Sequence, residues 1–281
     1  MTKVIKSIGA MKKFSETICK KGSSIGLVPT MGYLHEGHMS LVRRAKKDCD
    51  IVVVSIFINP TQFGPKEDLK RYPRDFSRDK RLLADAGVDV IFYPAAKQMY
   101  PEGYRTYIYV NGLSDMLCGA SRPGHFRGVT TVVAKLFNIV KPDIAYFGNK
   151  DFQQQVIIRK MAKDLNMGTK IVSMPIIREA DGLAMSSRNK YLNARQRTQA
   201  SVISRALKYA KLLAGSGIKG SNRIKAAILK LMRTAKDIKI DYVAICDPET
   251  LEEKKTVKGK TLIAVAAYLG RTRLIDNILV G

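Results

Sequence analysis

An almost uninterrupted apolar run over residues 51–58 constrains the fold of this chain more than any other feature. A strand that is apolar along its whole length is buried on both faces, as in a parallel sheet covered by helices. The surrounding sequence alternates strand and helix patterns. We predict an α/β fold with strands over 25–29, 51–58, 88–93, 144–147 and 170–176, and helices over 75–86, 129–140 and 152–166.

The pattern changes after residue 176. Residues 194–214 and 222–236 have the spacing of amphipathic helices rich in Lys, Arg and Ala, and 241–246 and 262–268 are typical of strands. We therefore predict two domains, a parallel-sheet domain over 1–176 and a smaller C-terminal α+β domain over 177–281. A chain of 281 residues is long enough for both.

Composition narrows the classes of protein. There is no run of eighteen apolar residues, and the first 22 residues contain no apolar signal core, so we expect neither a membrane span nor export. The cysteines show no paired spacing, which argues against a zinc site or a disulfide framework and favours a cytoplasmic location. They are Cys19, Cys49, Cys118 and Cys246.

The formal net charge of +25 is high. Lys and Arg side chains are mostly exposed in proteins, so a solvated basic surface explains most of this charge. The remaining explanations are phosphate-rich substrates or nucleic acid.

Polar, glycine-containing segments follow three of the predicted strands. They cover residues 30–38, 59–64 and 148–154. In open α/β sheets, ligands bind beyond the carboxyl ends of the strands. We therefore expect these segments to meet in one cleft.

Two of the three histidines fall in the first segment, in His35-Glu36-Gly37-His38. A lone His-x-x-His is compatible with a metal site, a helix cap or an exposed position. Here it follows a strand and begins a helix, where backbone N–H groups and imidazoles can converge on a phosphate. We predict that His35 and His38 bind phosphate.

The other two segments supply amides and an amine. Gln62 could cap its loop, but a neutral amide also suits a substrate hydroxyl or carboxylate. We expect one of the three glutamines at 153–155 to face the cleft. Lys150 could be an ordinary surface lysine, yet its place after a strand lets it reach a phosphate as a mobile charge.

A second cluster lies near the domain boundary. Ser186, Ser187 and Arg188 could form a polar linker, or a closing loop that wraps phosphate oxygens. His125 is equally compatible with a structural and a functional role. The chain has no P-loop, which disfavours a kinase, and no nucleophile–base arrangement for covalent catalysis.

These motifs together resemble a known family. The pairing of His35-Glu36-Gly37-His38 with Met185-Ser186-Ser187-Arg188 is similar to the signatures of the nucleotidyltransferase superfamily, which includes class I aminoacyl-tRNA synthetases. The longer strings at 29–38, 59–63, 122–126 and 178–189 resemble the pantothenate synthetase (pantoate–β-alanine ligase) family. The resemblance extends over essentially the whole chain, in order.

The resemblance implies ATP-dependent joining of D-pantoate to β-alanine through a pantoyl-adenylate, with release of AMP and pyrophosphate. It implies a Rossmann-like N-terminal domain, a C-terminal lid, a homodimer and a magnesium requirement with no readable metal ligand. His38 would be the proton donor, assisted by His35 and Lys150; Gln62 and Gln154 would bind substrate. The residues at the ATP site would be Met31, Gly32, Tyr33, Leu34, His35, Glu36, Gly37, His38, Gly148, Asn149, Lys150, Asp151, Ile177, Met185, Ser186, Ser187 and Arg188.

Two positions depart from the family pattern: Asn149 stands where Glu is common, and Ser121 where His is frequent. Two other functions remain as alternatives. Another adenylyl- or cytidylyltransferase would share the histidine motif but need no amine acceptor. A nucleic-acid-binding protein would fit the net charge, although we find neither stacking aromatics nor a helix-turn-helix, and we expect no specific nucleic-acid partner.

Overall fold

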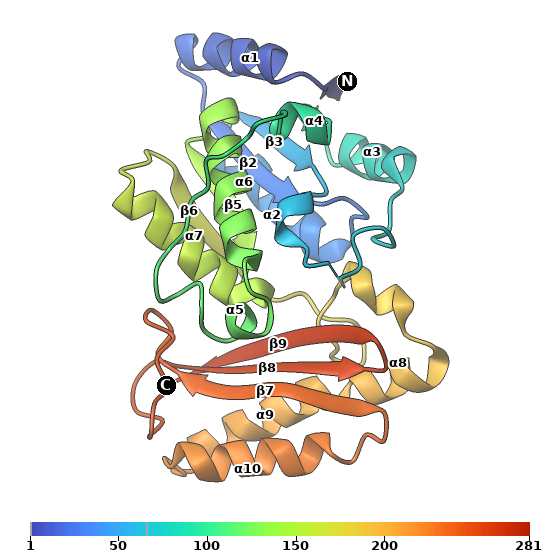
Figure 1. The fold of residues 1–281 in the computed structure, drawn as a ribbon, viewed down its shortest axis with the longest axis vertical. Helices are drawn as coiled ribbons and strands as arrows, with labels where there is room; N and C mark the ends of the chain where they lie inside the picture. The colour runs from blue at the N-terminus through green and yellow to red at the C-terminus, as the bar shows by residue number, and fades with distance from the viewer. Residues whose placement is uncertain (1, 66) are drawn as a thin grey trace.

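Six parallel strands form the main sheet of the computed structural model, which describes residues 2–65 and 67–281. The strand order is β1-β4-β3-β2-β5-β6 (Figure 1). This arrangement confirms the predicted α/β fold. The strands are β1 (Lys3–Ile5), β2 (Ile25–Thr30), β3 (Ile51–Ile56), β4 (Val90–Phe92), β5 (Ile144–Gly148) and β6 (Lys170–Met174).

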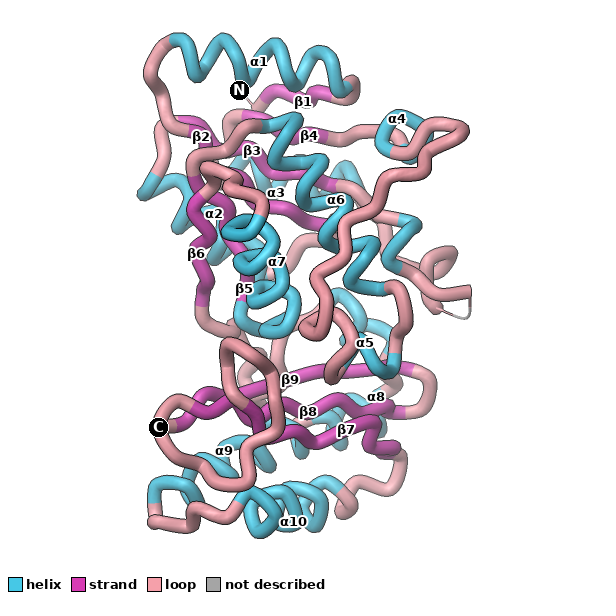
Figure 2. The backbone as a smooth tube through the Cα atoms, turned by 60° about the vertical axis from the view of Figure 1, so that its left-hand side comes forward, coloured by secondary structure: helices cyan, strands magenta, loops and turns pink. Residues whose placement is uncertain are grey.

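Helices cover both faces of this sheet, as the apolar strands require (Figure 2). Alternate residues of one strand point to opposite faces, so Leu27 joins one core and Val28 the other. On the first face lie α1 (Ile8–Lys20), α6 (His125–Val140) and α7 (Phe152–Asp164). On the second lie α2 (Glu36–Asp48) and α3 (Phe76–Asp85).

The strand order brings three carboxyl ends together. β2 pairs with β3 on one side and with β5 on the other, all parallel. From β2 the chain proceeds through β3 in one direction, and β5 lies in the opposite direction. A crevice opens at such a reversal of strand order, beyond the carboxyl ends. The three polar segments follow these three neighbouring strands, as the sequence predicts.

A separate antiparallel sheet lies below the parallel one (Figure 1). It consists of β7 (Ile238–Cys246), β8 (Thr261–Leu269) and β9 (Thr272–Val280). Helices α9 (Val202–Gly215) and α10 (Ser221–Met232) pack on its face away from the parallel sheet. A Gly-x-Gly-x-x-Gly spacing over 215–220 joins these two helices; because no strand precedes it, it is not a dinucleotide-binding turn.

Six short helical segments complete the part of the chain that the structure describes. They are α4 (Ala96–Met99), α5 (Cys118–Ser121), α8 (Ala194–Ala200) and, as 3₁₀ turns, η1 (Pro60–Gln62) and η2 (Asn149–Asp151), with a longer 3₁₀ segment η3 (Ser187–Tyr191). The parallel sheet ends at Met174 and the antiparallel sheet begins at Ile238. The exact domain boundary at 176/177 stays a prediction.

Several elements differ from the sequence-based expectations. The helix expected at 129–140 begins four residues earlier, at His125, because Gly124 turns the chain with a φ of +81°. The single helix expected at 194–214 is interrupted at Ser201, whose hydroxyl bonds back to the Thr198 carbonyl. β9 was not expected; it follows β8 through the two-residue turn 270–271.

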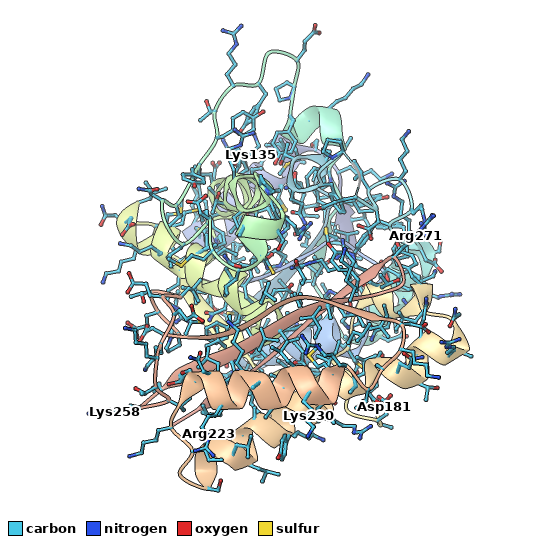
Figure 3. The ribbon with its side chains drawn as sticks, turned by 60° about the horizontal axis from the view of Figure 1, so that its bottom comes forward. Lys135, Asp181, Arg223, Lys230, Lys258 and Arg271 are labelled. Carbon is cyan, nitrogen blue, oxygen red and sulfur yellow. The ribbon has the colours of Figure 1, made fainter. Side chains whose placement is uncertain are left out.

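The basic residues are spread over the surface. Arg223 and Lys230 project from the exposed side of α10 (Figure 3). Arg271, in contrast, lies at the β8–β9 turn and borders the large cavity described below. Within the described part of the chain, none of the helices has the length and apolar character needed to cross a bilayer.

A buried ion pair fixes the segment that joins the two sheets. Asp276 on β9 is 3% exposed, and its carboxylate accepts two hydrogen bonds from Arg178, at 2.6 and 2.9 Å. Removing one partner leaves a buried charge without compensation.

We expect Arg178→Ala to lower the free energy of unfolding by about 3 kcal/mol, because Asp276 remains buried. Arg195→Ala is the matched control: it removes an exposed pair with Asp237, which we expect to contribute less than about 1 kcal/mol. Urea unfolding of both variants measures the difference. Equal losses would contradict the importance of the buried pair.

Candidate active site

Two adjoining cavities lie beyond the carboxyl ends of β2, β3 and β5. The inner cavity, about 220 Å³, is walled by the His35-Glu36-Gly37-His38 segment and by apolar side chains of α6. The outer cavity, about 990 Å³, opens between the two sheets. Eight residues border both cavities. They come from the segments that follow β3 and β5, from the start of α6 and from the 185–188 segment: Gln62, Arg122, His125, Lys150, Asp151, Gln154, Ser186 and Arg188.

His35 and His38 stand side by side at the start of α2, with ring centroids 4.1 Å apart. Nδ1 of His35 accepts a hydrogen bond from the Gly37 amide at 3.2 Å. Nδ1 of His38 accepts from the His35 amide at 3.3 Å. In a neutral imidazole whose Nδ1 accepts, the proton resides on Nε2. Both rings therefore offer an Nε2–H donor, and both border the inner cavity.

Burial keeps these two rings neutral. Burial, followed by the charge of Lys150, lowers the pKa of His35 to about 4. Burial, the neighbouring His35 and Lys150 hold the pKa of His38 well below its ordinary value of 6.5. At neutral pH the pair thus donates hydrogen bonds without carrying charge, and Lys150 is the cation beside it.

Glycine is required within this motif for a steric reason. A Cβ on Gly37 would lie 2.9 Å from the ring of His35, so a side chain there would push the imidazole off the backbone amide. The preceding turn uses φ values of +85° at Gly32 and +51° at Tyr33. Asp79 of α3 holds that turn by accepting from the amides of Tyr33 and Leu34, at 2.6 and 2.8 Å.

Lys150 borders both cavities, and its phosphate-binding role stays a prediction. The glutamines that follow have different partners. Gln154 borders both cavities, whereas the amide of Gln153 bonds to backbone groups around α5 and that of Gln155 bonds to Arg159 and Ser173. Gln153 also borders the outer cavity, so two of the three glutamines, and not one as expected, line the cleft. Of the three, only Gln154 borders the inner cavity, and its binding role stays a prediction.

The side chain of Gln62 is held by Asn59, which caps η1, and by Met31, which follows β2. Oε1 of Gln62 accepts from Asn59 at 3.1 Å, and its Nε2 contacts the sulfur of Met31 at 3.0 Å. Asn59, which is 1% exposed, also donates to the Gly128 carbonyl on α6 at 3.0 Å. The side chains of Gln62 and Met31 thus lie together at the floor of the inner cavity.

The 186–188 segment contacts the parallel-sheet domain. The Ser187 hydroxyl donates to the Tyr33 carbonyl at 3.2 Å, and Ser186 caps η3. The guanidinium of Arg188 makes a two-pronged pair with Asp68, at 2.8 and 2.9 Å. An ATP contact of Arg188, as predicted from the sequence, would therefore compete with Asp68, a partner that the sequence does not indicate.

Twelve of the predicted ATP-site residues border the inner cavity, including Met31, Ile177 and Met185. Five do not border either cavity. Gly32 and Tyr33 form the turn, and Leu34 is 1% exposed in the core. Glu36 is half-exposed and pairs with Arg43, while the carbonyl of Asn149 accepts from Asn277. Their contribution to ATP binding stays a prediction.

Three further residues shape the site without belonging to a recognisable motif. Asp79 holds the turn, Asp68 pairs with Arg188, and Tyr72, 7% exposed, borders the inner cavity. Each comes from the 67–85 stretch. A single acid or tyrosine in such a stretch has the composition of a surface position, so no sequence signal marks it.

The side chains at the site could bind a metal ion only together with the phosphates of a substrate. Over 2–65 and 67–281 there is no cluster of three His, Cys, Asp or Glu side chains that could hold an ion. Asp151, half-exposed beside Lys150, is a carboxylate at the cavity wall. Magnesium commonly relies on one or two carboxylates together with substrate phosphates and water.

A doubly wound parallel sheet with paired histidines at the start of a helix defines a nucleotide-binding α/β enzyme. The family model described as pantoate-beta-alanine ligase matches residues 3–279. A pantothenate synthetase from Thermotoga petrophila is 55% identical over 279 residues, covering 99% of this chain and 100% of that protein. One from Moorella thermoacetica is 53% identical over 276 residues, with 98% of both chains covered. The chain belongs to the pantoate–β-alanine ligase family.

Solved structures agree with this assignment. Pantothenate synthetase from Thermus thermophilus has a TM-score of 0.93 at 43% identity, with 98% of each chain covered. A pantoate-beta-alanine ligase from Francisella tularensis, complexed with beta-gamma ATP and beta-alanine, has a TM-score of 0.83 at 36% identity, covering 99% of this chain and 98% of that one.

The neutral histidines predict a pH dependence of stability. His35 and His125 have pKa values of about 4 in the folded chain, and that of His38 is also lowered, against 6.5 when unfolded. Below pH 6.5 the unfolded chain binds protons that the folded chain does not. Stability is therefore complete above pH 6.5 and falls toward pH 4, by up to about 1.4 kcal/mol per pH unit per histidine.

Urea unfolding at pH 7 and pH 5 measures this effect. Most carboxyl groups stay ionised at both pH values, so the difference in stability reports mainly on the histidines. We expect His38→Asn to show a smaller loss between the two pH values than the parent chain. Equal midpoints at pH 7 and pH 5 in the parent chain would contradict the neutral assignment.

Proposed function

We propose that this chain catalyses the ATP-dependent condensation of D-pantoate with β-alanine, through a pantoyl-adenylate, with release of pyrophosphate and AMP. The observation that carries this proposal is the meeting of His35, His38 and Lys150 at one cavity, from two strand ends. Family membership supports the same reaction.

The first step suits these donors. A carboxylate is a poor acyl donor, so the pantoate carboxylate attacks the α-phosphorus of ATP and pyrophosphate leaves. The resulting acyl-phosphate anhydride has AMP as a good leaving group. The two Nε2–H groups and the Lys150 ammonium are placed to stabilise charge on phosphate oxygens, because fixed donors in a water-poor site need little reorganisation.

The wall of the inner cavity suits pantoate. Gln62 and Gln154 offer neutral amides for its hydroxyl and carboxylate groups. Opposite them, α6 presents an apolar surface against which the two methyl groups of pantoate can pack. That surface consists of Val129, Val132, Val133 and Leu136.

In the second step the free amine of β-alanine attacks the acyl carbon, and the bond to the AMP oxygen breaks. The outer cavity, which shares Gln62 and Lys150 with the inner one, is the route for the amine. Water would hydrolyse the adenylate. Contacts of the 187–191 segment with Tyr33 and Arg71 support a lid role for the C-terminal domain, with closure excluding water.

Three further assignments belong to this proposal. Magnesium enters with the triphosphate and neutralises part of its charge, with Asp151 as the protein carboxylate nearest the phosphate donors. The chain works as a homodimer, as the family resemblance implies. It works in the cytoplasm, which suits four cysteines that all carry free thiols.

Pyrophosphate and AMP release test the reaction. With ATP and D-pantoate alone we expect at most one pyrophosphate per site, and with β-alanine we expect continuous AMP release. Continuous pyrophosphate release that ignores β-alanine would favour a nucleotidyltransferase. RNA binding that survives saturation with all three substrates would favour the nucleic-acid-binding alternative.

We expect His38→Ala to slow enzyme-bound adenylate formation by roughly 10²-fold, because it removes a fixed donor to the phosphate. Rapid-quench measurement with ATP and pantoate isolates this step. Asn138→Ala, on the exposed side of α6, is the control and should keep the parent rate. A normal adenylate burst in His38→Ala would contradict the assignment.

A further inference from the structure

His125, the third histidine, lies outside the phosphate-binding pair, yet it borders both cavities. We propose that His125, held by Arg122 and Glu67, is a positioning residue that fixes the backbone of Gln62 and thereby aims the Gln62 amide at the acyl substrate. This inference rests on the proposed substrate role of Gln62. It assigns His125 no contact with substrate.

The ring of His125 joins α6 to the η1 loop. Nδ1 lies 2.8 Å from the Gln62 carbonyl oxygen, and Nε2 lies 3.0 Å from NH1 of Arg122. A guanidinium only donates, so Nε2 must accept and Nδ1 must carry the proton that is donated to Gln62. Arg122 thus sets the tautomer that the Gln62 carbonyl needs.

Arg122 is itself fully engaged. Its Nε and NH2 donate to the two carboxylate oxygens of Glu67, at 2.7 and 2.6 Å. NH2 also lies 3.4 Å from the Gln62 carbonyl. The arginine is only 15% exposed and the glutamate 25%. Charge and hydrogen-bonding capacity are therefore satisfied within the network, which leaves neither ring nitrogen of His125 free for a ligand.

The electrostatics agree with a fixed neutral ring. Burial, followed by the charge of Arg122, lowers the pKa of His125 to about 4. A neutral ring in one tautomer gives the same hydrogen bond at every pH at which the enzyme works. A proton shuttle would instead need a pKa near neutrality.

The η1 loop is also held by contacts at its start, so that both ends of the loop around Gln62 are fixed. A Cβ on Gly128 would lie 2.3 Å from the Thr61 carbonyl oxygen, which shows how closely α6 approaches η1. Asn59 bonds both to Gly128 and to the Gln62 side chain. These contacts fix the start of η1; His125 fixes its last residue. Loss of that bond frees the carbonyl to rotate and misdirects the amide.

The Michaelis constants for D-pantoate and for ATP in three variants test the inference. We expect His125→Ala to raise the KM for pantoate about tenfold, the effect of one hydrogen bond, with the KM for ATP within twofold of the parent. His125→Asn should restore most of the pantoate affinity, because the asparagine amide can take the place of Nδ1–H. Asn138→Ala is the control on the same helix. Thermal melting identifies any variant that fails to fold.

Glu67→Gln, which weakens the hold on Arg122 from the edge of the network, gives a second readout if His125→Ala fails to fold. We expect it to raise the pantoate KM a few-fold. The inference is wrong if folded His125→Ala or Glu67→Gln keeps the parent pantoate KM, if the KM values for both substrates rise together, or if His125→Asn is as impaired as His125→Ala.

Gln62→Ala separates this failure from failure of the proposed site. An unchanged pantoate KM in Gln62→Ala would remove the substrate role of Gln62 itself. A raised pantoate KM in Gln62→Ala, together with a parent-like value in His125→Ala, would keep the site and reject the positioning role.

Discussion

Parallel pairing of β2 with both β3 and β5 is the constraint from which the site follows. Parallel neighbours present their carboxyl ends at one edge, so segments distant in sequence become adjacent without any contact between their side chains. The strands themselves are mostly apolar and buried, and most of the polar side chains of the site come from the loops that follow them. Their contribution is a rigid edge, on which loops hold donors at fixed separations.

Few of the side chains that border the inner cavity carry an unpaired positive charge. Of the donors that border the inner cavity, the imidazoles are neutral, and the guanidinium groups of Arg122 and Arg188 are paired with carboxylates. Lys150 is left as the cation nearest the two histidines, and it lies 3.9 Å from Asp151. For a substrate as highly charged as ATP, many unpaired cations would bind reactant and product phosphates alike. Oriented neutral dipoles instead act where charge develops.

The sequence was sufficient for the fold class and for those residues of the cavity wall that lie in contiguous motifs. An apolar strand and a glycine-containing loop each leave a local pattern, and the His35-Glu36-Gly37-His38 motif is contiguous. It was insufficient for Asp68, whose partner Arg188 lies 120 residues away, and for Asp79, whose partners lie 45 and 46 residues away. It was also insufficient for the role of His125. Such contacts depend on tertiary proximity, which no periodicity encodes. β9 was missed because apolar and polar residues do not alternate regularly along it.

The two-pronged bond between Arg188 and Asp68 has a consequence for how nucleotide is admitted. If Arg188 is to reach a phosphate, it must exchange one anion for another, and the carboxylate that it leaves must be rehydrated. The contribution of Arg188 to nucleotide affinity would then be the difference in free energy between the Arg188–phosphate and Arg188–Asp68 pairs, and not the full free energy of the first. Because Asp68 stays next to the site, release of a nucleotide from Arg188 would be favoured by the return of the Arg188–Asp68 pair.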